Sequence, residues 1–282
     1  MCKYCYEHTG KVWYLQDISH DLTAGRFLKV FPGRFRKWFY EFIDSKLDQF
    51  VDDSVADINE LQAERDPYKG LTRWFYNFFA KNILGGQVTT SVDDAIRVLD
   101  KGEDYFLHYC SCKRGAGGGD DYRCIFMNHN ARRQRKLSTE DRGRFIDRDE
   151  AEDIIREHRK DHHFHTVMWG MKAKVDCICN CDHYCAGLYV PEIRWGLLPS
   201  MKITRVKNRD RCDSDCNICM DICYANAIVK NDKERILKVN ENKCIGCHLC
   251  VENCPRGVFE SVPRKIYYDA AIGKIKTRNV DY

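Results

Sequence analysis

Apolar side chains in the first third of the chain recur at the spacing of an amphipathic helix. Over residues 34–64 they follow one another at steps of three to five, which places them close to one face. These positions are Phe35, Phe39, Ile43, Leu47, Phe50, Val55, Ile58 and Leu61. A proline and a glycine within residues 66–70 should end this helix, and a second helix is expected over 71–83. We therefore predict a helical hairpin in a mainly helical N-terminal region, residues 1–88.

Shorter apolar runs alternate with polar helical segments over residues 89–200. Ser91, followed by an acidic turn, is typical of a helix start. The expected elements are helices over 92–101 and 148–158 and strands over 105–110, 124–127 and 166–170. This alternation predicts a small α/β domain.

The last region, residues 201–282, begins with a strand pattern at 201–206. Near its end, residues 266–276 have the pattern of a closing hairpin. The three regions together predict an α+β fold.

Cysteine is the dominant chemical feature of the chain, with 17 among 282 residues. Eight of them lie in two runs. Residues 212–223 read Cys-DSD-Cys-NI-Cys-MDI-Cys, and residues 244–255 read Cys-IG-Cys-HL-Cys-VEN-Cys-Pro. The last three cysteines of the first run lie 31 residues before their counterparts in the second, so the runs are repeats. The second run has the spacing of a bacterial ferredoxin iron–sulfur motif, whose fourth cysteine serves a neighbouring cluster.

On these motifs, residues 202–262 resemble a dicluster 4Fe–4S ferredoxin domain. The resemblance implies a pseudo-twofold fold of two short hairpins and two short helices, and one-electron transfer through two cubane clusters. It also implies two ligand sets, Cys212, Cys216, Cys219 and Cys254 for one cluster and Cys244, Cys247, Cys250 and Cys223 for the other.

Two departures from the family pattern bear on this assignment. Tyr224 stands where the family usually has proline, which costs little because proline there only stiffens a turn. Three residues rather than two separate Cys212 from Cys216, which puts Asp213 at the place of the family's first cysteine. Either the loop bulges so that Cys212 ligates, or this cluster has a weak corner. We expect Cys212, because thiolate is a far better iron ligand than carboxylate and one extra loop residue is readily absorbed.

Zinc is the alternative for both runs, but zinc sites rarely chain four cysteines this closely twice over.

Nine cysteines lie outside the runs. We expect a third metal site in the middle domain, formed by Cys110, Cys112 or Cys124 together with Cys179, Cys181 and Cys185. A strand–helix–strand unit would bring the two groups together, and thiols gathered in a reducing environment are neutralised by a metal. Iron–sulfur is favoured over zinc because no compact zinc spacing is present, and buried free cysteines are the alternative.

The middle region resembles the segment that precedes the clusters in some anaerobic ferredoxin-like redox proteins. There a His-x-Cys-x-Cys-basic stretch, a helix and a Cys-x-Cys nest come before two cubane motifs, as residues 108–114, 148–158 and 177–181 do here.

At the N-terminus, Cys2 and Cys5 with His8 form either half a metal site or a pair of free thiols at a frayed end.

Charge and composition narrow the class of partner. The 46 basic and 42 acidic residues give a net charge of +4, which indicates no polyanionic partner such as nucleic acid. The basic cluster at 132–136 is typical of a solvated face, and the aromatic residues of the first helix of core packing. We expect no signal peptide and no transmembrane segment, since no apolar run approaches the roughly 20 residues of a membrane span. The cysteines then indicate reduced thiolate ligands in the cytoplasm.

We predict an iron–sulfur electron-transfer protein, or a subunit of an anaerobic oxidoreductase, that passes single electrons through two 4Fe–4S clusters. Lys243, Arg256 and Arg264 would guide docking to an acidic redox partner. The alternative is a redox enzyme whose middle domain holds a catalytic metal or iron–sulfur centre fed by the ferredoxin domain. No nucleophile–base pair or nucleotide motif stands out, so no catalytic residue is predicted. A third hypothesis, a nucleic-acid-binding module with structural clusters, is indicated only by the basic cluster at residues 132–136.

Overall fold

The computed structural model describes a large part of the chain from residue 86 onward. The described residues are 34, 35, 38, 86–115, 118–128, 130–132, 143–170, 174–184, 197–198, 202–231, 236–241, 243–263, 265–269 and 274–278. Arg34, Phe35 and Trp38 are helical and are the described residues of the helix expected over 34–64. The rest of the predicted helical hairpin, and the pair Cys2 and Cys5, lie outside the described residues.

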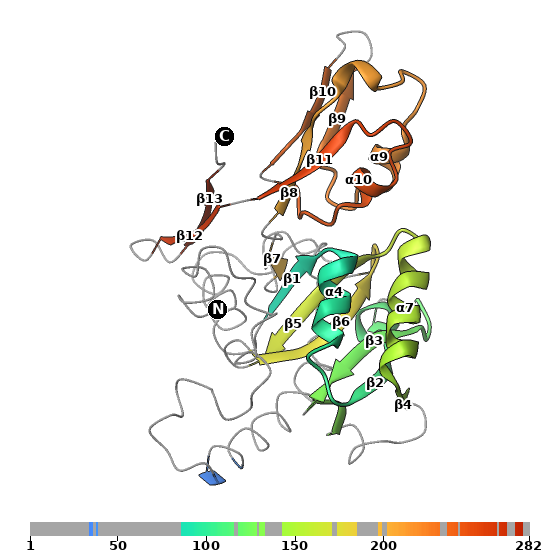
Figure 1. Cartoon of the computed structure of the whole chain (residues 1–282), viewed down its shortest axis with the longest axis vertical. Helices are drawn as coiled ribbons and strands as arrows, with labels where there is room; N and C mark the ends of the chain where they lie inside the picture. The colour runs from blue at the N-terminus through green and yellow to red at the C-terminus, as the bar shows by residue number, and fades with distance from the viewer. Residues whose placement is uncertain are drawn as a thin grey trace.

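A seven-stranded sheet in the order β4-β2-β3-β6-β5-β1-β7 forms the centre of the described fold (Figure 1). Its strands are β1 (Gly86–Thr90), β2 (Tyr105–Tyr109), β3 (Tyr122–Met127), β4 (Gly143–Ile146), β5 (Phe164–Gly170), β6 (Lys174–Cys181) and β7 (Leu197–Leu198). All neighbouring strands are antiparallel except β1 and β7. The strands predicted over 105–110, 124–127 and 166–170 are confirmed as β2, β3 and β5.

Two longer helices pack on one face of this sheet (Figure 1). The helices of this region are α4 (Val92–Leu99), α5 (Ser111–Gly115) and α7 (Arg148–Lys160). Ser91 and Asp147 cap α4 and α7, since each side chain accepts the backbone N–H three residues later, at 3.2 and 2.8 Å. The apolar sides of both helices and the strands beneath them form a core of Val88, Ala95, Val98, Leu99, Leu107, Ile125, Ile155, Val167 and Ile178. The predicted helix start at Ser91 is therefore confirmed.

The topology refines the picture of the middle region. The sheet is antiparallel almost throughout, so its strand pairs are not the parallel pairs typical of an α/β domain, although β4, α7 and β5 form a strand–helix–strand segment. The cysteine nest at 177–181 belongs to strand β6, whose alternate residues fill both faces of the sheet. The residues after β2 form the short helix α5.

The C-terminal region has the two-fold repeat that the cysteine runs predict. Its elements are β8 (Lys202–Val206), α9 (Ile218–Asp221), β9 (Ile228–Asn231), β10 (Ile236–Val239), α10 (Leu249–Glu252) and β11 (Phe259–Pro263). The helices and the strands after them begin 31 residues apart, at Ile218 and Leu249 and at Ile228 and Phe259. β9 and β10 form a hairpin, whereas β8 pairs with β11. Only one of the two strand pairs implied by the resemblance is thus a hairpin of consecutive strands. The other joins the first and last strands of the repeat.

The turn after each cysteine run repeats as well. Asn226 and Gly257, again 31 residues apart, have φ values of 46° and 59°. This left-handed conformation suits asparagine and glycine, and it turns the chain from the short helix into the following strand. The predicted closing hairpin is confirmed as β12 (Lys265–Asp269) paired with β13 (Lys274–Arg278).

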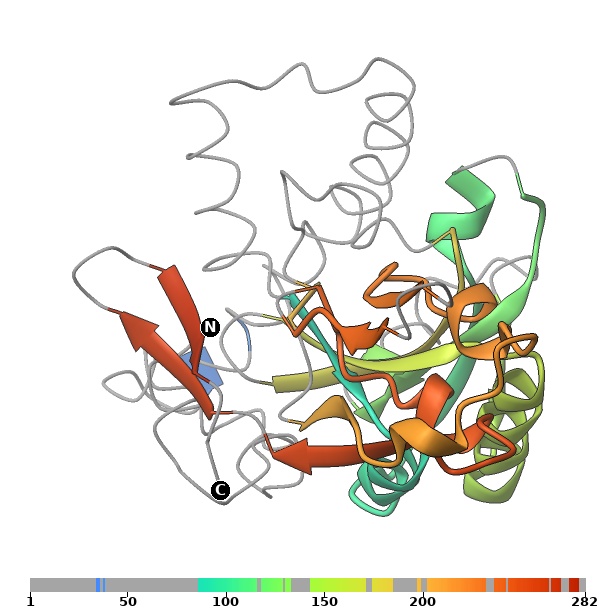
Figure 2. The ribbon, with the colours of Figure 1, turned by 90° about the horizontal axis from the view of Figure 1, so that it is seen from above.

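The C-terminal region packs against the sheet face opposite α4 and α7. Cysteines of β3 and β6 share one apolar cluster with Phe164 of β5 and with Ile222 and Leu249 of the C-terminal region. In Figures 1 and 2 the C-terminal elements, coloured orange to red, lie beside the sheet. The sheet is therefore covered by helices on one face and by cysteine-rich segments on the other. None of the helices in the described ranges has the length and apolar character needed to cross a membrane.

Candidate metal centres

The first cysteine set gathers around Cys219 of α9. Cys212, Cys216 and Cys254 lie close enough for their charges to act on its thiol. Burial first, and then these three neighbours, raise the pKa of Cys219 to about 11. The structure thus brings three cysteines of the first run together with the last cysteine of the second, which is the first of the two expected sets.

The second set gathers around Cys250 of α10. Burial is the largest cause of its raised pKa, the hydrogen bond to Thr204 opposes it, and the thiols of Cys247, Cys244 and Cys223 add to it. Burial also raises the pKa of Cys247 to about 12. A metal would have to displace these protons, and binding would then stabilise the fold that gathers the thiols.

Each run ends in a cysteine that accepts a backbone hydrogen bond. The N–H of Ala227 lies 3.3 Å from the Sγ of Cys223, and the N–H of Val258 lies 3.4 Å from the Sγ of Cys254. The two contacts are related by the 31-residue repeat. Hydrogen bonds to ligating sulfur are one means by which a protein sets the potential of an iron–sulfur cluster. The cysteine thiols and the backbone N–H groups beside them therefore fit the iron–sulfur clusters that the cysteine runs imply.

The side chain of Asp213 is directed away from a ligand role. Its Oδ2 lies 2.5 Å from Nη2 of Arg256, and its Oδ1 accepts the backbone N–H of Asp215 at 3.1 Å. The preceding Cys212 instead belongs to the cluster around Cys219. This arrangement supports Cys212 as the corner ligand.

Lys230 of β9 holds the loop that contains the extra residue. Its ammonium group donates to the carbonyl oxygens of Asp213 at 2.8 Å and Cys216 at 3.0 Å, and also to that of Ser214. Three carbonyls on one ammonium fix the bulge that separates Cys212 from Cys216. The sequence reasoning missed Lys230, because the cysteine spacing carries no signal for a residue 14 positions beyond the loop.

A second cysteine-rich cluster lies in the sheet itself. Cys177, Cys179 and Cys181 alternate along β6 and so share one face, and Cys179 pairs in register with Cys124 of β3. Cys110 follows β2 and Cys112 lies on α5, and both belong to this cluster. All the described cysteines of the expected third site therefore come together, while Cys185 lies outside the described residues. Cys177 was not among the expected ligands.

The thiols of this cluster contact one another. Hydrogen bonds from Cys112 and then Cys124, with the charge of Arg123, lower the pKa of Cys110. The hydrogen bond with Cys110 is the largest cause that raises the pKa of Cys124. For Cys179, the hydrogen bond with Cys124 lowers the pKa, but that with Cys177, 3.6 Å between sulfurs, and burial leave it raised to about 11. The cluster is thus a continuous chain of sulfur contacts.

A buried ion pair lies at the edge of this cluster. Arg123 makes two hydrogen bonds to Asp182, at 2.5 and 2.9 Å, and the two side chains are 1% and 8% exposed. The Nη2 atom, which donates to Oδ1 of Asp182, also lies 3.4 Å from the Sγ of Cys110. Burial alone would raise the pKa of Asp182, but His163, Arg123 and the N–H of Tyr184 hold it below its usual range. The sequence pattern gave no signal for this pair, since its members are 59 residues apart.

Two side chains connect the sheet to the second cysteine set. Arg159 of α7 donates to the backbone oxygen of Cys247 at 3.0 Å and to the carboxylate of Glu252 at 2.7 Å. The ring of Tyr224 lies 5.5 Å from that of Phe164, centroid to centroid. The residue that replaces the usual proline therefore contributes to the contact with the sheet.

The spacing of the sulfurs distinguishes a cluster from a single zinc ion. Around one tetrahedral zinc ion the ligating sulfurs lie about 3.8 Å apart, as Zn–S bonds of about 2.3 Å require. Among the described cysteines, no three sulfurs all lie within 4.8 Å of one another. Neither the ferredoxin-type sets nor the sheet cluster therefore has three described sulfurs at the spacing of a single zinc ion.

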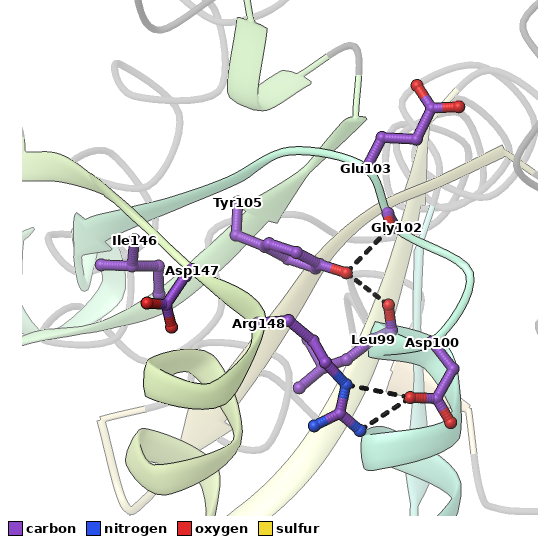
Figure 3. Close-up of a pocket in the computed structure, with 8 residues that line it drawn as sticks. All are labelled: Leu99, Asp100, Gly102, Glu103, Tyr105, Ile146, Asp147 and Arg148. Atoms are coloured by element: carbon purple, nitrogen blue, oxygen red, sulfur yellow. Dashed lines mark hydrogen bonds and ion pairs between the residues drawn. The ribbon is translucent and has the colours of Figure 1, made fainter.

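A hollow outside the cysteine clusters lies where the α4–β2 turn meets the start of α7 (Figure 3). The single O–H of Tyr105 lies between the backbone oxygens of Leu99, at 2.5 Å, and Gly102, at 2.9 Å, and shares its proton between them. Arg148 reaches the carboxylate of Asp100 at 2.7 Å. These groups satisfy one another across the hollow, so it is a structural junction between the helices and the sheet.

The family described as 4Fe-4S dicluster domain matches residues 211–258. No curated protein and no solved structure matches the chain. The C-terminal region thus carries a dicluster ferredoxin-type domain, which indicates iron–sulfur cluster binding and an electron-transfer function.

Proposed function

We propose that this protein passes single electrons through two 4Fe–4S clusters as an electron-transfer protein or as a subunit of an anaerobic oxidoreductase. The observation that carries the proposal is the interleaving of the two cysteine sets, each with three thiols from one run and one from the other. This exchange of the fourth ligand is the pattern of a two-cluster ferredoxin.

Cys212, Cys216, Cys219 and Cys254 would hold the first cluster, and Cys244, Cys247, Cys250 and Cys223 the second. The clusters supply reversible one-electron reduction at potentials that the surrounding protein adjusts. The N–H groups of Ala227 and Val258 donate to one ligand of each cluster and favour its more negative, reduced state. Arg159 adds a positive charge beside the second set and Arg256 one beside the first, so nearby charges should adjust the potentials of both clusters.

We further propose that the sheet cysteines form a third centre next to the second cluster. The sheet cluster and Cys247 belong to one packed group, whereas the first set lies in a different one. Electrons would then enter at the first cluster and pass through the second to the third centre. Iron–sulfur remains the favoured chemistry, for the reason of sulfur spacing given above.

The surface beside the first cluster fits a protein partner. Ile218 is 42% exposed there, and Arg211 and Arg256 line a shallow hollow next to it. An exposed apolar side chain between basic residues matches an acidic redox protein, which charge would steer to this surface. Thiolate ligands in such number fit a reducing compartment, so we propose the cytoplasm.

The second candidate function is a redox enzyme with its chemistry at the third centre. It is favoured by the contact of Arg123 with Cys110, because a cation beside a thiolate is typical of a reactive cysteine. Against it, Cys110, Cys124, Cys179 and Cys181 are all buried, which fits a relay better than a site open to substrate.

The test of the electron-transfer function is anaerobic reduction followed by oxidation with a one-electron acceptor. Dithionite should bleach the visible thiolate-to-iron absorbance, and the acceptor should restore it over repeated cycles. The variant Cys250→Ser should lose part of this signal. The control Ser261→Ala, which changes a side chain of β11 but no cysteine, should retain it. A chain that contains zinc and no iron after anaerobic reconstitution would refute the proposal.

The third centre has its own test, the double variant with Cys179→Ala and Cys181→Ala. It should lose metal relative to the wild type while retaining the two ferredoxin-type clusters. Ile178→Val, on the opposite face of the same strand, is the control for packing. If the double variant binds as much metal as the wild type, the third centre does not exist.

A further inference from the structure

A histidine pair lies at the end of α7, outside all the cysteine sets. His158 is in the last turn of the helix, His163 follows three residues after its end, and their Nδ1 atoms are 3.0 Å apart. Asp161, between them, offers a carboxylate oxygen within 4.8 Å of a ring nitrogen of each histidine. His162 has φ of 62°, and this left-handed residue turns the chain so that His163 faces back towards the helix.

We propose that His158, Asp161 and His163 bind a divalent transition-metal ion, with zinc as the best match. Two imidazole nitrogens and one carboxylate oxygen are a usual ligand set for zinc. Of the described His, Cys, Asp and Glu side chains, only these three bring their ligand atoms so close together. Because Asp161 is exposed, a water molecule can complete a tetrahedral shell.

A carboxylate behind His163 supports the assignment. The Oδ2 of Asp182 lies 3.5 Å from the Nε2 of this histidine, and Asp182 is 5% exposed. A histidine that binds metal through one ring nitrogen commonly directs the other N–H to a carboxylate, which fixes the ring and the tautomer. In the metal-free form Arg123 Nη1 donates to the Nε2 of His163 at 3.3 Å. Metal on Nδ1 would place the proton on Nε2, so that Asp182 accepts it while Arg123 keeps its two hydrogen bonds to Asp182.

The charges around the histidines do not oppose a cation. Two guanidinium groups lie close by. Arg159 donates to the backbone oxygen of His163 at 3.2 Å and pairs with Glu252, and Arg123 has its Nη1 3.3 Å from the Nε2 of His163. The charge of Arg123 is offset by Asp182 at 2.5 Å and Asp121 at 3.5 Å. Asp161 adds one further negative charge on the solvent side. Without a metal, the two Nδ1 atoms share a proton in an ordinary hydrogen bond. The experiment must distinguish this hydrogen-bonded pair from a pair that binds a metal ion.

A metal ion at this site would have a structural role next to the electron-transfer region. It would fix the end of α7, where Arg159 bonds to the backbone of Cys247, and the start of β5, where Phe164 packs against Tyr224. The proposal does not depend on the iron–sulfur assignment, since none of its ligands is a cysteine.

The test is zinc titration of the full chain with its cysteine sites already filled under anaerobic conditions. Calorimetry should show one zinc site, and X-ray absorption at the zinc edge should show nitrogen and oxygen ligands at about 2.0–2.1 Å. Asp161→Asn alters an exposed side chain and should weaken zinc binding about 10-fold or more. His163→Gln should weaken it more than about 100-fold, since losing a ligand exceeds the 10–100-fold cost of losing an outer partner.

Matched controls separate binding from folding. Asp153→Asn, an exposed acid on the same helix, and His183→Gln, an exposed histidine of the same region, should bind zinc as the wild type does. Circular dichroism and the visible spectrum verify that each variant is folded. Zinc held by sulfur at about 2.3 Å, or equal zinc affinity in Asp161→Asn and the wild type, would overturn the site.

Discussion

The buried pair of Arg123 and Asp182 permits a quantitative test of how the middle sheet is stabilised. Replacing Asp182 with leucine removes the carboxylate but keeps an apolar side chain of similar size, and replacing Arg123 with methionine does the same for the cation. The two side chains are 1% and 8% exposed, so either replacement alone leaves a charge almost without water. The double variant removes both charges together.

The expected magnitudes follow from the contacts. Removing one member of a buried ion pair costs about 3–5 kcal/mol, because the remaining charge loses its main partner; Asp121, 3.5 Å from Arg123, offsets this only in part. Asp182 also accepts the N–H of Tyr184 at 2.8 Å, and the loss of that bond adds about 1 kcal/mol. Asp182→Leu should therefore lower the free energy of unfolding by about 4–6 kcal/mol and Arg123→Met by about 3–5 kcal/mol. The double variant should lose only about 1–3 kcal/mol, mainly from hydrogen bonds that are no longer made.

Urea unfolding followed by far-ultraviolet circular dichroism, with thiols kept reduced, measures these differences. Asp153→Asn serves as a surface control and should stay within about 0.5 kcal/mol of the wild type. The decisive comparison is the double variant against the sum of the single ones. If the double variant is as unstable as that sum, mutual neutralisation is not the reason this pair stabilises the sheet.

Three further predictions follow from other contacts. Cys212→Ser should convert the first cluster to a three-iron form or lose it, which iron analysis and electron paramagnetic resonance detect; an unchanged spectrum would point to Asp213 or solvent as ligand. Arg159→Gln removes a positive charge beside Cys247 and should lower the potential of the second cluster by on the order of 40 mV, equivalent to about 1 kcal/mol, in a redox titration; an unchanged potential would contradict the role of this charge. Tyr105→Phe removes the one O–H donor that two backbone oxygens share and should cost about 1–2 kcal/mol at neutral pH. Burial is the largest cause that raises the pKa of Tyr105, so the phenol favours folding below the unfolded pKa of about 10 and this contribution is lost above it. The stability difference between Tyr105→Phe and the wild type should therefore shrink in alkaline solution, and a constant difference would refute this reasoning.

The C-terminal region could be predicted from the sequence because its ligands are local. Three thiols of each set come from one run of twelve or fewer residues, so the spacing alone fixes which cysteines meet. The repeat of 31 residues then fixes where the short helices and turns recur, as Ile218 and Leu249 illustrate. The expectation of two hairpins was wrong in part, because the pairing of β8 with β11 joins segments that no local pattern connects.

The middle region was harder to predict because its contacts are between distant segments. No strand was predicted at the alternating cysteines of β6, since cysteine carries little strand signal and the apolar positions between them are few. The register of Cys124 with Cys179 depends on the whole antiparallel sheet, and a strand–helix–strand unit was expected instead. The ion pair of Arg123 and Asp182 likewise has no pattern that sequence reading detects.

The central claim is that the C-terminal region holds two four-iron clusters through interleaved cysteine sets. Iron and sulfide analysis of anaerobically prepared protein, combined with electron paramagnetic resonance of the reduced form, tests it most directly. We predict at least about eight iron and eight sulfide ions per chain, as two four-iron clusters require, and the signals of two magnetically coupled clusters. A chain with about four irons and one uncoupled signal, or with zinc alone, would contradict the account.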